Sequence, residues 1–105
     1  MKTLKLIQQG DCLFRKLAKM PKGKQKVIAT KKLVVAHGES GHSHVIEGDE
    51  AELILIGEKM ILNLTRPATL KHEEHKAILF EPGIWEVGRV REFDYFKQME
   101  RTVID

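Results

Sequence analysis

The sequence of 105 residues predicts an all-β protein, either a small single-domain barrel or a two-sheet sandwich built from short antiparallel strands. Short runs of β-branched and other apolar residues alternate with turn signals along the chain, as they do in such folds. No stretch keeps a 3.6-residue apolar period over three turns, which an amphipathic helix would show. The length suits one domain, residues 1–105, with a modest core.

The first half of the chain is expected to hold several strands and one basic loop. Residues 18–26 contain four lysines, a proline and a glycine, which predicts an exposed and mobile loop. Lys31 and Lys32 separate two β-branched segments and are expected at a turn or a sheet edge. Strands are predicted over residues 3–7, 12–17, 27–30, 33–36 and 42–47.

The clearest hairpin spans residues 52–64. Gly57-Glu58 separates two apolar arms, and a glycine in the first position suits a two-residue type II′ turn. Both arms are apolar on both faces for part of their length, so we expect them to be central and buried. Two more strands are expected over 77–80 and 84–93, joined by a turn at Pro82-Gly83, before a tail with a helical turn and a last short strand.

Composition predicts a soluble protein of the cytoplasm. The chain is 42% hydrophobic and 31% charged, as globular proteins are. The longest apolar run, residues 33–36, is too short to span a membrane, and the N-terminus lacks the apolar stretch of a signal peptide. Cys12 is the single cysteine, so no internal disulfide can form, and we expect it to be a small buried hydrophobe.

Charge is distributed unevenly along the chain. Residues 1–44 hold ten Lys/Arg and two Asp/Glu, whereas residues 45–105 hold eight and thirteen. A basic first half could contact phosphate groups, and two oppositely charged faces could associate. The candidate phosphate contacts are Lys22, Lys24, Lys26, Arg89 and Arg91.

All five histidines lie between residues 36 and 75, in two short motifs. His42 and His44 are two apart, so on a strand both imidazoles point to one face. His72 and His75 are three apart and would point to opposite faces unless Glu73-Glu74 forms a helical turn or a bulge. Histidine is the commonest metal ligand and changes charge near neutral pH, so this region is the candidate site.

The histidines predict a site for a divalent metal ion. Three neutral imidazoles with an open position describe a catalytic zinc site, and imidazole with carboxylate suits iron and related metals. The candidate ligands are His42, His44, His72 and His75, the candidate supporting residues are His37, Glu47 and Glu74, and the candidate ions are zinc, iron, nickel and manganese. The three-residue spacing of His72 and His75 excludes the zinc-protease motif, which needs four. No nucleophile is identifiable, so no reaction is predicted.

Several motifs together resemble a family of small uncharacterised proteins found in bacteria and phages. Its pattern is Gly-Asp, then Gly-Glu-Thr-Gly-His-x-His, then His-Glu-Glu-His, then Pro-Gly-x-Tyr-Glu-Val and Arg-Glu-Tyr. This chain has Ser40, Trp85 and Phe93 at three positions of the pattern. The resemblance covers residues 8 to 95 and implies no activity. Gly38 to His44 also resembles in part the first motif of the cupins, but no histidine follows Pro82-Gly83, as the second cupin motif requires.

Two other functions stay open at this point. A nucleic-acid or nucleotide-phosphate binding module would use the basic residues, with Trp85 and Phe93 stacking on bases. An assembly module of a phage or bacterium would need no site and would form homo-oligomers through exposed strand edges.

Overall fold

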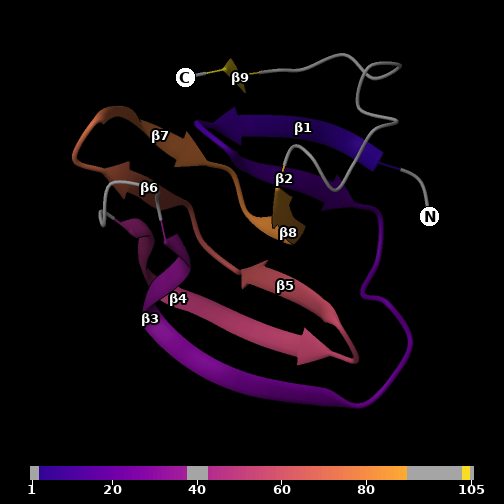
Figure 1. The fold of residues 1–105 in the computed structure, drawn as a ribbon. Coiled ribbons are helices and arrows are strands. Elements are labelled where there is room, and N and C mark those ends of the chain that lie inside the picture. The colour runs from indigo at the N-terminus through magenta and orange to yellow at the C-terminus, as the bar shows by residue number, and fades with distance from the viewer. Residues whose placement is uncertain (1–2, 38–42, 90–102, 105) are drawn as a thin grey trace.

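The computed structural model describes residues 3–37, 43–89 and 103–104, and in these the protein is all-β with no helix, as predicted. The strands form one nearly closed, barrel-like sheet, antiparallel apart from the short parallel pair of β1 and β9 (Figure 1). They are β1 (Thr3–Gln9), β2 (Cys12–Leu17), β3 (Gln25–His37), β4 (Ser43–Ile56), β5 (Lys59–Leu64), β6 (Ala68–His72), β7 (His75–Phe80), β8 (Gly83–Arg89) and β9 (Val103–Ile104). No described segment is a helix of the length and apolarity that crossing a membrane requires.

The predicted hairpin at residues 52–64 is confirmed as the centre of the sheet. β4 and β5 pair from Ala51↔Leu64 to Ile56↔Lys59, around the turn at Gly57-Glu58. Gly57 has φ 62°, the left-handed value that the first position of a type II′ turn needs. Apolar side chains on both faces of the hairpin are buried, as their sequence predicts.

A line of bends crosses the sheet and divides it into two halves. β4 pairs with β6 through residues 45–47 and with β5 through residues 51–56, so β5 and β6 act as one long strand interrupted at residues 65–67. β7 and β8 likewise act as one strand interrupted at residues 81–82, because β7 pairs with β6 and β8 with β5. We call this line the crease; it crosses β4 at residues 48–50.

Local chemistry explains the crease. A Cβ on Gly48 would lie 2.8 Å from the Cβ of Ala68, so only glycine allows β4 and β6 to approach this closely. Pro67 and Pro82 lack the N–H that a continuous ladder would use. The backbone N–H of Thr65 instead donates to the carbonyl of Glu50 across the bend, at 3.3 Å. β3 follows the same bend at Lys31, whose φ is 69°.

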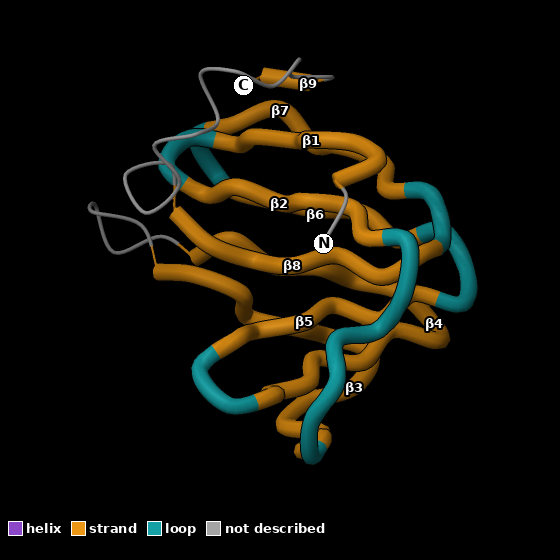
Figure 2. Tube along the Cα trace, turned by 90° about the vertical axis from the view of Figure 1, so that its right-hand side faces the viewer, coloured by secondary structure: helices purple, strands orange, loops and turns teal. Residues whose placement is uncertain are grey.

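The core lies between the two halves. The half on one side of the crease contains β6, β7 and the adjoining parts of β3 and β4; the other contains β5, β8, β2 and β1 with the remaining parts of β3 and β4 (Figures 1 and 2). Phe80 of the first half packs its ring against Phe14 and Trp85 of the second, with centroids 4.9 and 4.8 Å apart. All three rings are fully buried, so the aromatic residues near β8 serve the core.

The connection from β2 to β3 differs from the predicted lysine-rich loop over residues 18–26. β3 begins at Gln25, so Lys26 lies on a strand. Pro21 is buried, and Met20 packs with Ile54 and Ile61 on the outer face of the β5–β8 half. The connection from β2 to β3 therefore crosses this face and is held to it by the side chains of Met20 and Pro21; it runs along the front of Figure 2.

The barrel is completed between β1 and β7 by side chains. Among the described strands, β1 pairs with β2 and β9, and β7 pairs with β6, so no backbone ladder joins β1 to β7. Lys5 forms an ion pair with Glu81 near one end of this gap, with Nζ and Oε1 3.1 Å apart. Near the other end, the side-chain amide of Gln9 donates to the carbonyl oxygen of Lys76 over 2.9 Å.

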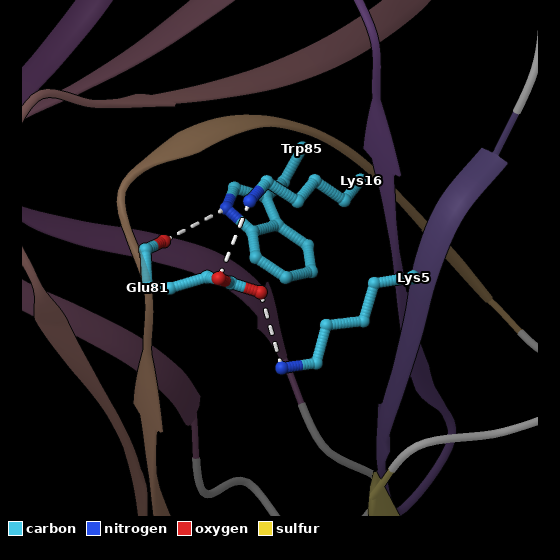
Figure 3. Close-up of polar contacts among 4 residues, drawn as sticks. All are labelled: Lys5, Lys16, Glu81 and Trp85. Carbon is cyan, nitrogen blue, oxygen red and sulfur yellow. Dashed lines mark hydrogen bonds and ion pairs between the residues drawn. The ribbon is translucent and has the colours of Figure 1, made fainter.

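Glu81 organises the first of these two contacts (Figure 3). Its carboxylate lies between the ammonium groups of Lys5 and Lys16, at 3.1 and 3.4 Å. Its backbone carbonyl accepts a hydrogen bond from the indole N–H of Trp85 at 3.3 Å. The two lysines hold the pKa of the Glu81 carboxyl below its ordinary value. We call Lys5, Lys16, Glu81 and Trp85 the carboxylate closure.

Candidate functional site

The two histidine motifs meet in space. His44 on β4, His72 at the end of β6 and His75 at the start of β7 form one cluster of imidazole rings. The ring centroids of His44 and His72 are 4.4 Å apart, those of His72 and His75 are 4.6 Å apart, and those of His44 and His75 are 5.9 Å apart. Residues distant in sequence thus supply three nitrogen-bearing rings to one place.

Hairpin geometry brings His72 and His75 to the same face. Glu73-Glu74 is the two-residue connection between β6 and β7, and His72 lies directly opposite His75 across the hairpin. Directly opposed residues of an antiparallel pair project to the same side of the sheet. The predicted alternatives were a helical turn or a bulge at Glu73-Glu74; the structure has a two-residue hairpin connection there, with a register shift between Leu70 and His72.

Gln9 is a site residue that the sequence analysis missed. Its side chain is fully buried, and its Oε1 lies 2.9 Å from Nδ1 of His44. Because the Gln9 amide nitrogen donates to the carbonyl of Lys76, Oε1 must accept from His44. His44 therefore carries its proton on Nδ1, which leaves the lone pair on Nε2. The sequence offered one sign of this role: Gln9 is two residues after Ile7, so on a strand its polar side chain points to the same face as that apolar one. We call Gln9, His44, His72 and His75 the histidine closure.

His44 is held neutral. Its side chain is buried, and burial lowers its pKa from 6.5 to about 4, with further lowering by the neighbouring His72 and His75. Asp11 acts in the opposite direction with a smaller effect. At neutral pH this imidazole is thus uncharged, the form that binds metal ions.

The turn between β1 and β2 covers the cluster. Gly10 has φ 56°, and a Cβ at this residue would lie 2.8 Å from Nε2 of His75 and 3.6 Å from Cε1 of His44. A side chain would need both a left-handed backbone and space that the imidazole of His75 occupies. Gly10 therefore lets the backbone pass directly over the imidazoles.

His72 connects the cluster to the surface. Its Nδ1 accepts a hydrogen bond from the backbone N–H of Glu74 at 3.1 Å. The residue also lines an open groove of about 560 Å³ on the outer face of the β6–β7 half. The other lining residues are Lys32, Ser43, Val45, Glu47, Lys71, Glu73 and Ala77.

The remaining candidate ligands and supporting residues are placed differently from one another. His42 lies outside the described residues, and His37 is placed by its backbone only, opposite Ser43. The carboxylate of Glu47 forms an ion pair with Lys71 at 3.0 Å and lines the outer groove, on the other face of β4 from His44. Glu74 reaches the cluster through its backbone N–H.

Of the candidate phosphate contacts that the structure describes, only Arg89 lies close enough to the histidine closure to affect the pKa of His44. Lys22, Lys24 and Lys26 are exposed around the start of β3. Arg89 lies at the end of β8, with its Nη1 3.8 Å from a carboxylate oxygen of Asp11. Arg91 lies outside the described residues.

Cys12 behaves as the buried hydrophobe that its sequence context predicts. The thiol lies in the main core, and burial, assisted by Asp11, raises its pKa to about 12. A thiol with so high a pKa carries almost no thiolate at neutral pH, so it is a poor nucleophile and a poor ligand.

With the side chains in their present positions, the described part of the chain contains no group of three His, Cys, Asp or Glu residues arranged to hold a metal ion. A model of a protein family described as a domain of unknown function, DUF8820, matches residues 8–90. No curated protein and no solved structure matches the chain.

Proposed function

Because the chain belongs to the DUF8820 family, whose description states no activity, we propose a function from the site alone: binding of a divalent transition-metal ion by His44, His72 and His75. The observation that carries the proposal is the convergence of three imidazoles from three strands within ring distances of 4.4 to 5.9 Å. Imidazole ligands suit zinc, nickel, copper and iron.

Gln9 supports this proposal through its bond to His44. A metal-binding histidine usually donates its second ring N–H to a carbonyl or carboxylate, which fixes the tautomer and turns the ring. Gln9 Oε1 accepts from Nδ1 of His44 in this way, so Nε2 is available as the ligand atom. The low pKa of His44, about 4, means that a metal ion need not displace a proton from it near pH 7.

Binding also requires a rearrangement of His72. Its Nδ1 accepts the N–H of Glu74, so in the neutral ring the proton is on Nε2. To bind a metal through Nε2, His72 must move this proton to Nδ1 and give up the bond to Glu74. Glu74 lies in an exposed turn, where its N–H can bond to water instead. His72 is partly exposed and lines the outer groove, so this ring is accessible from solvent.

Elemental analysis by inductively coupled plasma mass spectrometry on untagged protein tests the proposal, together with calorimetric titration of zinc into the metal-free protein. We expect near-stoichiometric metal, reduced at least tenfold in affinity by His44→Ala, His72→Ala or His75→Ala. Glu81→Gln in the carboxylate closure is the matched control and should keep the metal. Metal-free protein that takes up no zinc, nickel, iron or manganese at neutral pH would overturn the proposal.

His42→Ala separates two versions of the site. If this variant loses the metal as well, the ligand set includes His42, as the sequence analysis predicts. If it keeps the metal with unchanged affinity, the three described histidines are sufficient.

A further inference from the structure

We propose that the outer edge of β3 is a docking site for an extended, acidic segment of a partner protein, which would add to the sheet as a further strand. Within the described residues, β3 is paired on one side only, with β4. The part of this edge at the start of β3 lies on the outside of the fold in Figures 1 and 2, away from the histidine closure. The inference does not depend on metal binding.

This edge is unusually apolar for a surface. Four large hydrophobic side chains are exposed among the described residues, and three of them lie on β3: Val27 at 49%, Ile28 at 42% and Val34 at 44%. β-branched residues favour extended pairing, and an unpaired strand edge offers free backbone N–H and C=O groups. A peptide that adds to such an edge gains backbone hydrogen bonds, and its alternate side chains contact the exposed apolar ones.

The same edge is strongly basic. Exposed lysines stand at positions 22, 24, 26 and 31, and no acidic residue occurs between Asp11 and Glu39. A second copy of β3 would bring an identical set of lysines against these, so charge repulsion opposes self-pairing. An acidic strand meets complementary charge at Lys22, Lys24 and Lys26, whereas Asp49, Glu50 and Glu52 lie beside Thr30 and Lys31 at the far end. The lysines thus disfavour the homo-oligomer that the sequence analysis considered and select a different occupant.

Bends in β3 define how much of the edge is usable. The register with β4 shifts between Thr30 and Lys32, and Lys31 has φ 69°, so the straight edge ends at Thr30. A second shift, at Ile28, limits continuous backbone pairing to short stretches on either side. The docking segment is therefore Gln25–Thr30, with Lys24, Lys26 and Lys31 around it.

Nucleic acid is the less suitable partner for this edge. Single strands bind basic surfaces that also present aromatic rings for base stacking. β3 carries no Phe, Tyr or Trp, and Phe14, Phe80 and Trp85 are fully buried. Exposed valine and isoleucine side chains suit apolar side chains of a peptide.

The test uses the full-length protein and a synthetic capped peptide of alternating glutamate and valine. Binding is followed by NMR on isotope-labelled protein and by hydrogen exchange of the backbone amides. We expect shift changes centred on Gln25–Thr30, increased protection of amides there, and at least tenfold weaker binding for Lys26→Glu. Lys76→Glu, an equal charge change at an exposed position of β7, should leave the affinity within twofold. A peptide of the same composition with its glutamates in one block should bind at least tenfold more weakly.

Four outcomes of the binding experiments would overturn the proposal, and so would a fifth seen in the protein alone. The four are the absence of binding at millimolar peptide, shift changes that map away from β3, equal weakening by Lys26→Glu and Lys76→Glu, and tighter binding of a single-stranded oligonucleotide that displaces the peptide. Concentration-dependent protection of Gln25–Thr30 in the protein alone would show that a second copy occupies the edge, and would also contradict it.

Discussion

The carboxylate closure and the histidine closure both span the gap between β1 and β7, yet they use opposite chemistry. Glu81 joins Lys5 and Lys16 through complementary charges near the surface. The histidine closure instead gathers three basic rings, which repel one another once more than one is protonated. The carboxylate closure thus spans the gap with attraction between opposite charges. The proposed metal ion would bind the three rings in their neutral form and so avoid the repulsion between protonated rings.

Replacement of Gln9 should have the largest effect. Gln9→Leu removes both the acceptor for Nδ1 of His44 and the donor to the carbonyl of Lys76, which leaves one buried and one partly buried polar group without this partner. We expect a loss of about 2–4 kcal/mol in the free energy of unfolding and a 10- to 100-fold loss of metal affinity. Urea denaturation and zinc titration measure the two effects.

Gln25→Leu, at an exposed glutamine, is the control and should change neither quantity. Unchanged stability of Gln9→Leu would mean that the histidine closure contributes nothing to the fold.

The two closures should also respond differently to acid. The folded metal-free protein keeps His44 neutral down to about pH 4, whereas an unfolded chain protonates it near pH 6.5. The unfolded state binds more protons between these values, so stability is full above pH 6.5 and falls as the pH is lowered to about 4. We expect a loss of about 2 kcal/mol over this range, because one pKa unit corresponds to about 1.4 kcal/mol and partial solvation reduces the effect.

Urea denaturation of metal-free protein at several pH values checks this prediction, and His44→Gln should flatten the profile between pH 6.5 and 4. The carboxylate closure keeps its contribution over this range and loses it only at lower pH, where Glu81 becomes protonated, because the two lysines hold the pKa of this carboxyl below its ordinary value. A profile that is flat from pH 6.5 to 4 in the wild-type protein would contradict the assigned state of His44.

Removal of the Glu81 charge should have the smallest effect. Glu81→Gln breaks two ion pairs of an exposed carboxylate with partly buried lysines, and ion pairs near the surface contribute little and are screened by salt. We expect a slight fall in melting temperature at low salt. This fall should disappear in 1 M sodium chloride, where the Debye screening length is about 3 Å. A large fall that persists at high salt would show that the carboxylate closure, and not the histidine closure, holds β1 against β7.

The sequence predicted the architecture because strand signals are local. Gly57-Glu58 and its apolar arms specify a hairpin within residues 52–64, and the structure confirms it. The crease was not predicted, because its bends appear in the sequence as an ordinary lysine, glycine or proline at separate positions. Only the pairing of β4 with both β5 and β6 shows that Gly48 and Pro67 lie on one line.

The site was predicted only in part, because residue types can be identified in the sequence but contacts between distant residues cannot. The residue types of both histidine motifs were visible, but their convergence depends on the hairpin at Glu73-Glu74 and on the approach of β1 to β7. Gln9 is 35 residues from His44 in the sequence, so a glutamine in a turn-like context gave no sign of its partner. Glu47 was grouped with the histidines by proximity in sequence, yet strand alternation carries it to the outer face with Lys71.

The crease also constrains where this chain can change in length. Successive bends lie at residues 48–50, 65–67 and 81–82. Bends on neighbouring strands must stay in register for the two halves of the sheet to pack against each other. An insertion within β5 or β8 would move one bend out of line and turn the following side chains to the wrong face. Added residues at the tip Gly57-Glu58 would lengthen a hairpin and leave every bend in place. Related sequences should therefore differ in length at this tip and keep constant spacing along the arms between the bends.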